Sequence, residues 1–302
     1  MKKFILLSLL TLSLSAKTIT PNEVYTQAML IQDHIHYLLK YYNIKHDHEG
    51  ILKNVTVSTR LKPRNSWQKA YEILVKINML RSSYNLSRVE PVGMEPVEHL
   101  NPAMVYGMTQ RILAEIKIFE VRKGIDMPIF KLKNFIYKTP LDVYNSFFHI
   151  SASFDELNRA ELSPTYVFAE TMRIYDDLTL VLHYLNISDN TIPSTRLVKV
   201  TVADLIKIAM KVLEKLQKLQ RSVGIESSDF SSFAKKDATS SDVYTITGMI
   251  LAELQPLKAY IGLSESITPP ALRYGKKVPA DIEQLMNWNL RKLALIKKLE
   301  RR

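Results

Sequence analysis

A helix-start motif recurs along the chain and constrains the fold more than any other feature. The clearest copy is Thr139-Pro140-Leu141-Asp142-Val143-Tyr144. Thr139 can cap a free backbone N–H, proline suits the first helical position, and Asp142 places an anion at the positive end of the helix. Related starts lie at Thr20, Asn101, Ser163 and Thr239, and weaker copies begin at Pro63, Thr201 and Val278. The sequence therefore predicts eight helices.

The far ends of these helices repeat as well. Apolar periodic runs close at an Asn or Gly that is followed by Ile or Leu, and such a pair suits a left-handed helix stop. The pairs are Asn43-Ile44, Asn85-Leu86, Gly124-Ile125, Asn186-Ile187, Gly224-Ile225 and Gly262-Leu263. In five helices the first-turn apolar residue and the stop residue lie 20 positions apart. A fixed length indicates one structural unit that has been copied several times.

The spacing of the helix starts predicts the architecture. First-turn residues fall at Val24, Trp67, Val105 and Val143, and then at Val167, Leu205, Val243 and Ile282. Steps between them are 38 to 43 positions within each set, and 24 positions between the sets. We expect an all-α, eight-helix repeat array built as two tandem four-helix modules, residues 17–161 and 162–302. The short connector at 159–162 predicts an antiparallel hairpin between the helices on either side.

Most connectors are longer than helical bundles need. Segments 126–138 and 188–200 carry a proline and several apolar side chains, so we expect them to pack along the helices. Connectors of this length can join helices that run either parallel or antiparallel to each other. An aromatic residue follows the first apolar residue of five helices, and we expect it to pack against a connector and not to form a binding stripe. These aromatic residues are Tyr25, Tyr106, Tyr144, Phe168 and Tyr244.

The first 16 residues read as a secretory signal peptide. Two lysines precede a short apolar run at 4–14, with small residues at Ser13, Ser15 and Ala16. The run is too short to span a bilayer, and no later segment is long and uncharged enough to do so. We expect a periplasmic bacterial protein that is not transmembrane. The chain has no Cys, which excludes disulfides, thiolate metal sites, cysteine nucleophiles and a lipid anchor on cysteine.

The chain is basic, with 41 Lys and Arg against 30 Asp and Glu. Removal of residues 1–16 takes away Lys2 and Lys3 and lowers the net charge from +11 to +9. A secreted protein meets little nucleic acid, so the charge favours an acidic envelope protein, peptidoglycan or another anionic surface as partner. A scattered, solvated charge that only maintains solubility is the other interpretation.

A search for chemical sites finds no convincing set. The densest group of metal ligands is His46-Asp47-His48-Glu49, which is more typical of a solvated polar turn, and His34 and His36 diverge on a helix. The carboxylate pairs Asp155-Glu156 and Asp176-Asp177 are adjacent residues that cannot form a facing dyad, and we interpret them as exposed helix faces. We predict no catalytic residues, no metal site and no cofactor.

Basic residues gather at the end of the amphipathic last helix and form the one candidate contact set. They are Lys297, Lys298, Arg301 and Arg302. We expect this helix to dock on the fold, with the basic end available to a partner. The first functional hypothesis is a periplasmic scaffold or adaptor without catalysis, an accessory component of a larger cell-envelope assembly. The alternative is a solute- or envelope-polymer-binding module with a cleft between the two helical halves.

Overall fold

A computed structural model describes residues 18–46, 60–90, 92–228, 230, 238–297 and 299. Within these residues the chain is all-α, as predicted, with eight helices and no β-strand. The helices are α1 (Pro21–Tyr41), α3 (Pro63–Ser83), α4 (Pro102–Arg122), α5 (Pro140–Asn158), α6 (Pro164–Tyr184), α7 (Val202–Ser222), α8 (Ser240–Tyr260) and α9 (Pro279–Leu295). The proposed signal peptide lies outside the described residues.

All eight predicted helix starts are confirmed. In α5 the Thr139 hydroxyl accepts a hydrogen bond from the Asp142 N–H at 3.2 Å, and the Asp142 carboxylate accepts one from the Thr139 N–H at 2.8 Å. The same reciprocal cap opens α1, α7 and α8. Each reciprocal cap satisfies backbone donors that the first turn leaves free, which is why a short motif fixed the starts so closely.

The six predicted helix stops are also confirmed. Their left-handed residues are Asn43, Asn85, Gly124, Asn186, Gly224 and Gly262, with φ between 54° and 101°. The N–H of the apolar residue that follows bonds back into the last turn, as from Ile44 to the Leu39 carbonyl at 2.8 Å. The end of α5 was not predicted, because Arg159 adopts φ 52° there without being Gly or Asn.

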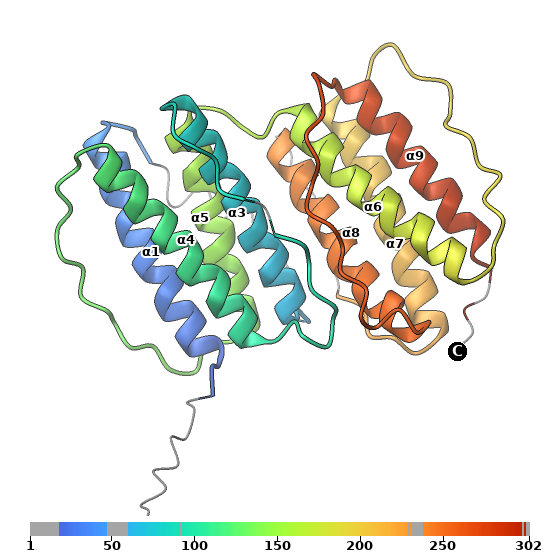
Figure 1. Cartoon of the computed structure of the whole chain (residues 1–302), viewed down its shortest axis with the longest axis horizontal. Helices are drawn as coiled ribbons and strands as arrows, with labels where there is room; N and C mark the ends of the chain where they lie inside the picture. The colour runs from blue at the N-terminus through green and yellow to red at the C-terminus, as the bar shows by residue number, and fades with distance from the viewer. Residues whose placement is uncertain are drawn as a thin grey trace, which may run out of the picture.

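The helices pack as two groups of four (Figure 1). The first group contains α1, α3, α4 and α5, and the second contains α6, α7, α8 and α9. In both groups the first and second helices contact the third and fourth but not each other. A shared packing order is what a duplicated module would produce. The exact boundary between residues 161 and 162 stays a prediction.

The four helices of the first group are parallel. Their first turns meet around one cavity of about 30 Å³, lined by Pro21, Val24, Pro63, Ser66, Pro102, Val105, Pro140 and Val143. The second group is also parallel and runs in the opposite direction (Figure 1). The connectors at 126–138 and 188–200 therefore return along their groups to the common starting end, which explains their surplus length.

The predicted hairpin between α5 and α6 is wrong. These helices run in opposite directions but do not contact each other, and the two groups are joined through α3 and α8. The two joining helices approach closely, since a Cβ on Gly248 would lie 2.8 Å from Cγ of Gln68. A five-residue connector can reverse the chain without bringing its helices into contact, so its length alone did not determine the packing.

The connectors contact the helices, as predicted, but most of the apolar side chains on which that prediction rested are exposed, among them Ile129, Leu132 and Ile192. Rings of Tyr25 and Phe135 meet at 5.0 Å, and rings of Phe168 and Tyr274 at 5.2 Å. Two connectors from different groups also pair, because Met94 and Thr268 exchange backbone hydrogen bonds of 2.8 and 3.0 Å. The predicted aromatic packing is right for these two helices, whereas Tyr144 and Tyr244 are buried among helices. None of the helices described is long and apolar enough to cross a membrane.

Candidate binding cleft between the two helical groups

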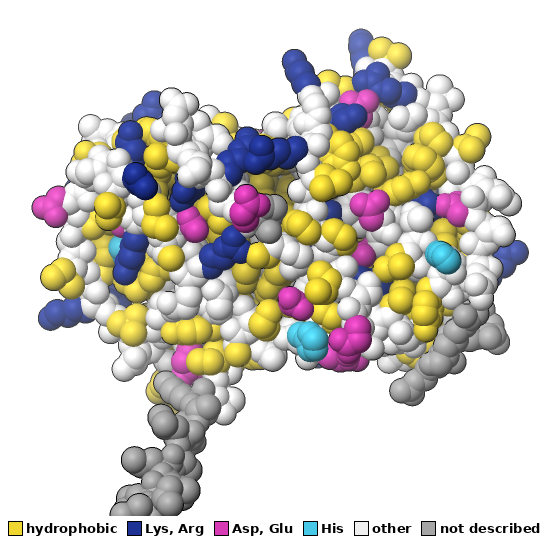
Figure 2. Space-filling model, viewed as in Figure 1, with side chains coloured by type: hydrophobic (Ala, Val, Ile, Leu, Met, Phe, Trp, Pro, Cys, Tyr) yellow, Lys and Arg dark blue, Asp and Glu magenta, His cyan; other side chains and the backbone are white. Residues whose placement is uncertain are grey.

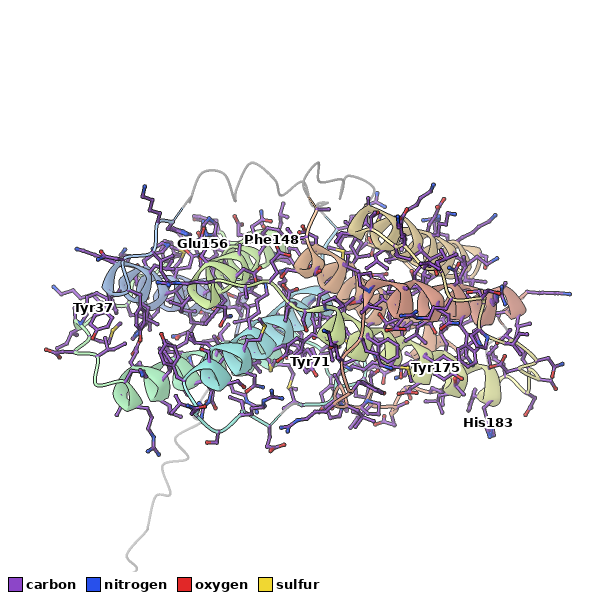
Figure 3. The ribbon with its side chains drawn as sticks, turned by 90° about the horizontal axis from the view of Figure 1, so that it is seen from above. Tyr37, Tyr71, Phe148, Glu156, Tyr175 and His183 are labelled. Carbon is purple, nitrogen blue, oxygen red and sulfur yellow. The ribbon has the colours of Figure 1, made fainter. Side chains whose placement is uncertain are left out.

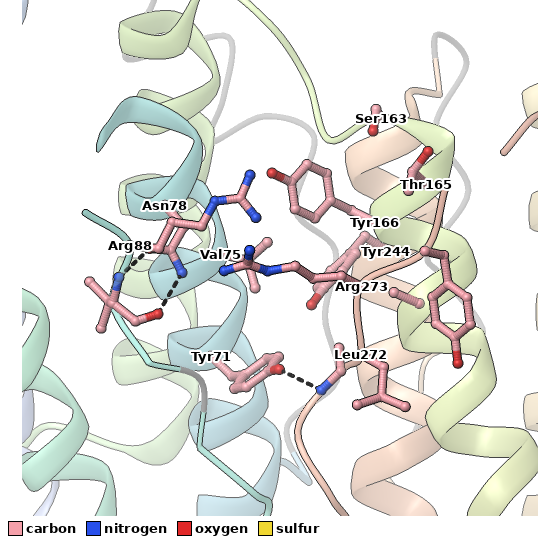
Figure 4. Close-up of a pocket in the computed structure, with 14 residues that line it drawn as sticks. Tyr71, Val75, Asn78, Arg88, Ser163, Thr165, Tyr166, Tyr244, Leu272 and Arg273 are labelled. Carbon is pink, nitrogen blue, oxygen red and sulfur yellow. Dashed lines mark hydrogen bonds between the residues drawn. The ribbon is translucent and has the colours of Figure 1, made fainter. Parts of the chain in front are cut away.

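A cleft of about 410 Å³ lies where the two groups meet. One wall is α3, the other is the start of α6 with part of α8, and the connectors that follow α3 and α8 complete it (Figure 4). Figure 2 shows a hollow between the groups with Lys and Arg side chains beside it. Four tyrosines line the cleft: Tyr71, Tyr166, Tyr244 and Tyr274.

Helix geometry places the side chains of the α3 wall. Tyr71, Val75 and Asn78 are spaced by four and three residues, so they share one face of the helix. The Asn78 amide fixes the adjoining connector: it donates to the Val89 carbonyl at 3.1 Å and accepts from the Val89 N–H at 2.7 Å. This pair of bonds holds the connector, and the neighbouring Arg88 with it, against the rim of the cleft.

Tyr71 forms the floor and lies between the two groups in Figure 3. Its ring stacks on Trp67 at 5.9 Å, and the guanidinium of Arg173 lies 4.6 Å from the ring centre. The Tyr71 hydroxyl oxygen accepts a hydrogen bond from the Ala271 N–H at 3.2 Å. Burial raises the pKa of Tyr71, so its hydroxyl stays protonated at neutral pH.

Behind the floor lies a buried ion pair between Glu170 and Arg173 of α6. Nη1 of Arg173 lies 3.0 and 3.1 Å from the two carboxylate oxygens. The carboxylate also accepts hydrogen bonds from the amide of Gln68 and, at 3.2 Å, from the hydroxyl of Tyr244. Burial raises the pKa of Tyr244 well above its usual value. The two charges behind the floor thus already pair with each other, and the charges that remain for a ligand lie at the rim of the cleft.

Two arginines of different origin converge at the rim. Arg88 follows α3 and Arg273 follows α8, and Figure 4 shows both guanidinium groups and the Tyr166 hydroxyl directed into the cleft. Nε of Arg88 donates to the Ser82 hydroxyl at 3.1 Å. Neither guanidinium is bonded to a carboxylate anywhere in the described part of the chain. Both are exposed, and their terminal nitrogens are available to a ligand.

The first turn of α6 adds a third positive element to the cleft. Ser163 is the N-cap of α6 and lines the cleft together with Thr165, and its side chain makes no capping hydrogen bond. Free N–H groups and the helix dipole favour an anion at such an end. A guanidinium offers a planar set of donors that matches carboxylate or phosphate. The arrangement can therefore bind an anion.

The described side chains that line the cleft include no His, Asp, Glu, Lys or Cys. These types supply most general acids, general bases and nucleophiles in enzymes. Ser163 has no neighbouring base among the described lining residues.

Of the four predicted contact residues only Lys297 lies within the described residues, and it does not line the cleft. Lys297 is exposed just after α9, and Lys298, Arg301 and Arg302 lie outside the described residues. Their role stays a prediction. Arg88 and Arg273 were missed by the sequence reasoning, because each stands alone in a connector and only the tertiary packing joins them.

The histidines form local contacts. Nδ1 of His34 lies 2.7 Å from Glu120, whereas the ring of His36 lies 5.1 Å from the ring of His46. Nδ1 of His46 lies 2.5 Å from Glu156, so this residue packs on the helices and is not in a solvated turn. His48 lies outside the described residues. Within the described ranges no three His, Cys, Asp or Glu side chains are arranged to hold a metal ion.

The interpretation of the carboxylate pairs as exposed faces is wrong for three of four residues. Asp155 bonds to Lys76 at 2.7 Å, Asp177 bonds to Lys258 at 2.9 Å, and Glu156 contacts His46. Asp176 is exposed, as expected. The partners of the three come from elements distant in sequence, and a single-helix pattern could not reveal them.

Comparison of the chain with family models, curated proteins and solved structures finds no match.

Proposed function

We propose that this protein is a non-catalytic binding protein of the bacterial periplasm, and that the cleft between its helical groups takes an anionic ligand. The proposal is the second of the two functional hypotheses that the sequence favours. One observation carries it: Arg88 and Arg273, from different groups, direct into one tyrosine-lined cleft guanidinium groups that pair with no carboxylate of the described residues.

The cleft dimensions and lining indicate the class of ligand. Small-molecule sites commonly occupy ~300–1,000 Å³, and the cleft falls in that range. The half-buried rings of Tyr166 and Tyr274 suit the flat apolar face of a sugar or an aromatic ring, and their hydroxyls can bond polar groups. We expect a carboxylate or phosphate carried on such a ring, either as a free solute or as the exposed unit of an envelope polymer.

The scaffold hypothesis is kept as a second candidate on a separate observation. The connector at 188–200 leaves Ile192 and Val198 exposed on the surface of the second group. Apolar side chains on an ordered surface can contact a partner protein. A scaffold could also carry a ligand in the cleft, so the two functions do not exclude each other.

The test measures thermal stability in the presence of two defined probes, inorganic phosphate and glucuronate. A ligand that binds only the folded protein raises the melting temperature by an amount that grows with the logarithm of its concentration above its Kd. We expect either probe to stabilise the wild type at low salt. The double variant Arg88→Ala/Arg273→Ala should bind at least about ten-fold more weakly, since hydrogen bonds to charged groups contribute roughly 1.5–3 kcal/mol each.

Arg221→Ala is the matched control, because Arg221 is an exposed arginine on α7 outside the cleft. It should respond to the probes as the wild type does. An equal response of the double variant and the control would contradict the proposal, as would a wild type whose melting temperature neither probe changes.

A further inference from the structure

The connector at 126–138, named here the α1 strap, is fixed along α1 at several levels. The ring of Phe130 lies 4.9 Å from His34, and the ring of Phe135 lies 5.0 Å from Tyr25. The Tyr37 hydroxyl donates to the Asp126 carbonyl at 3.0 Å, and the Lys138 N–H donates to the Asn22 side chain at 2.8 Å. Figure 3 places Tyr37, and so this end of the strap, at the far end of the molecule from the second group.

The outer side of the α1 strap exposes large apolar side chains. Ile129 is 96% exposed and Tyr137 is 89% exposed, and Leu132 and Ile136 are exposed as well. Single exposed apolar residues are common on proteins, but four within nine residues form a patch that calls for a partner. The inner rings of Phe130 and Phe135 hold the strap in place, so these side chains project from an ordered segment.

Basic residues accompany the apolar ones. From Val121 at the end of α4 to Lys138, the chain has five basic residues and one acidic residue, a net charge of +4. Lys131 and Lys133 are exposed between Ile129 and Ile136, and Val121 adds a further exposed apolar side chain. Apolar side chains that alternate with lysines combine the two attractions that hold a peripheral protein on an anionic bilayer.

We infer that the α1 strap docks this protein on a membrane surface rich in anionic phospholipid. Charge complementarity supports a lipid surface, because the only acidic residue of the segment is Asp126. The abundance of lysine argues against a protein partner, since protein interfaces are depleted of lysine and prefer arginine and buried aromatic residues. In the docked state the apolar side chains enter the headgroup region while the lysines contact lipid phosphates.

The connector at 188–200 offers an internal comparison. It also exposes apolar side chains, with Ile192 at 71% and Val198 at 94%. Its charges are largely satisfied within the fold, because Arg196 pairs with Asp281 at 2.6 Å and Asp189 pairs with Lys292. It therefore has exposed apolar groups without a matching basic set, and it serves as the control surface.

The experiment measures sedimentation of the purified, processed protein with vesicles of phosphatidylcholine alone or mixed with phosphatidylglycerol. We expect binding to the mixed vesicles and little binding to phosphatidylcholine. Each lysine near an anionic surface contributes about a five-fold gain in partitioning to the membrane. The affinity of Lys131→Glu/Lys133→Glu for the mixed vesicles should therefore fall by at least about 30-fold. The affinity of Ile129→Ser/Tyr137→Ser for the same vesicles should fall by about ten-fold or more, because the apolar contact with the lipid is removed.

Two controls separate this inference from folding defects and from the cleft. Ile192→Ser/Val198→Ser and Arg88→Ala/Arg273→Ala should bind vesicles as the wild type does, and all variants should keep the wild-type circular dichroism. The inference is overturned if the wild type does not bind phosphatidylglycerol vesicles, or if the strap variants bind as well as the controls. Strap-dependent capture of an acidic protein by a chain that does not bind vesicles would likewise replace the lipid with a protein partner.

Discussion

The helices that join the two groups, α3 and α8, are called here the inner helices, and they differ in what they bury from the outer helices α4 and α7, which contact only helices of their own group. On α7 the buried residues are almost all aliphatic and lie on one face, with lysines on the other. On α8 nearly the whole circumference is buried, and it includes Asp242, Glu253 and Lys258. On α3 the buried set includes several charged side chains: Arg64, Lys69, Glu72, Lys76 and Arg81. The inner pair thus holds the two groups together with charged groups as well as apolar ones.

The buried charges of the inner helices find partners across the junction. Arg64 of α3 donates to Glu253 of α8 at 3.2 Å, and Thr245 of α8 donates to Glu72 of α3 at 2.9 Å. A buried charge is costly unless it is paired with good geometry, so only one register of α3 against α8 satisfies these groups. The comparison teaches that apolar faces build each group, whereas polar pairing specifies how the groups meet.

The largest expected effect is at Glu72. Its carboxylate accepts hydrogen bonds from Lys69 at 2.9 Å and from the Ser151 hydroxyl at 2.5 Å. Burial alone would raise the pKa of Glu72, but Lys69 and Lys76 outweigh burial and lower it. Glu72→Ala leaves buried cations without their partner and should cost about 3–5 kcal/mol in the free energy of unfolding. Urea denaturation followed by circular dichroism measures this.

The control for Glu72 is an exposed ion pair near the same junction. Glu226 lies 2.9 Å from Lys62, with both side chains largely exposed. Glu226→Ala should leave the urea midpoint unchanged, because exposed pairs contribute little. If both variants shifted the midpoint equally, the buried network would not be what distinguishes the inner helices.

Two glycine substitutions should change the free energy of unfolding by an intermediate amount and in opposite directions. Gly248→Ala places a methyl group 2.8 Å from Cγ of Gln68 at the junction and should destabilise the fold by about 1–3 kcal/mol. Gly107 is an exposed residue of α4, where a Cβ would meet nothing within 4 Å, so Gly107→Ala should stabilise the fold by about 1 kcal/mol. Melting temperatures test both, and two changes of the same sign would refute the contrast between inner and outer helices.

The smallest effect concerns the cap of α5 and its dependence on pH. Partial burial would raise the pKa of Asp142, but hydrogen bonds from Thr139 outweigh it and hold the pKa below the usual 3.8. A carboxylate whose pKa is lowered by folding stabilises the protein at pH values above its pKa in the unfolded chain. This stabilisation is lost as the pH falls through its pKa in the folded protein. Asp142→Ala should therefore cost about 0.5–2 kcal/mol at pH 7, and the difference from wild type should shrink below about pH 4.

Thermal melts of both proteins from pH 2.5 to pH 7 test this prediction. A difference that stays constant over this range would show that the carboxylate charge does not act in the cap.

The fold was predictable where its determinants are local. Starts such as Thr139 with Asp142 and stops such as Asn43 with Ile44 act within a few residues, so a repeated motif fixed nearly every helix end. The junction was not predictable in this way. Lys69 and Glu72 look like an exposed pair on a helix surface, and only the packed structure shows them buried against Thr245. The sequence of α8 itself has few charged residues, and this was the available signal for its place at the junction, since a helix that is apolar on all sides is buried.

The candidate cleft was anticipated only as a place between the two halves. Its arginines stand in connectors, which have no periodic pattern from which orientation could be inferred. Arg88 is positioned by the bonds between Asn78 and Val89, and Arg273 follows the chain that pairs Thr268 with Met94. Both anchors join residues distant in sequence or in different groups, so no local rule could place the guanidinium groups together.

The packing order within each group has a consequence for how the chain reaches its native state. Because α1 contacts α4 and α5 but not α3, most helix contacts join segments separated by at least one long connector. Helical bundles usually fold fast since their contacts are close in sequence, and rates fall as that separation grows. The third and the fourth helix of each group both pack against the first two, so each core depends on helices that long connectors separate in the sequence. Refolding should accordingly be slow for an all-α protein.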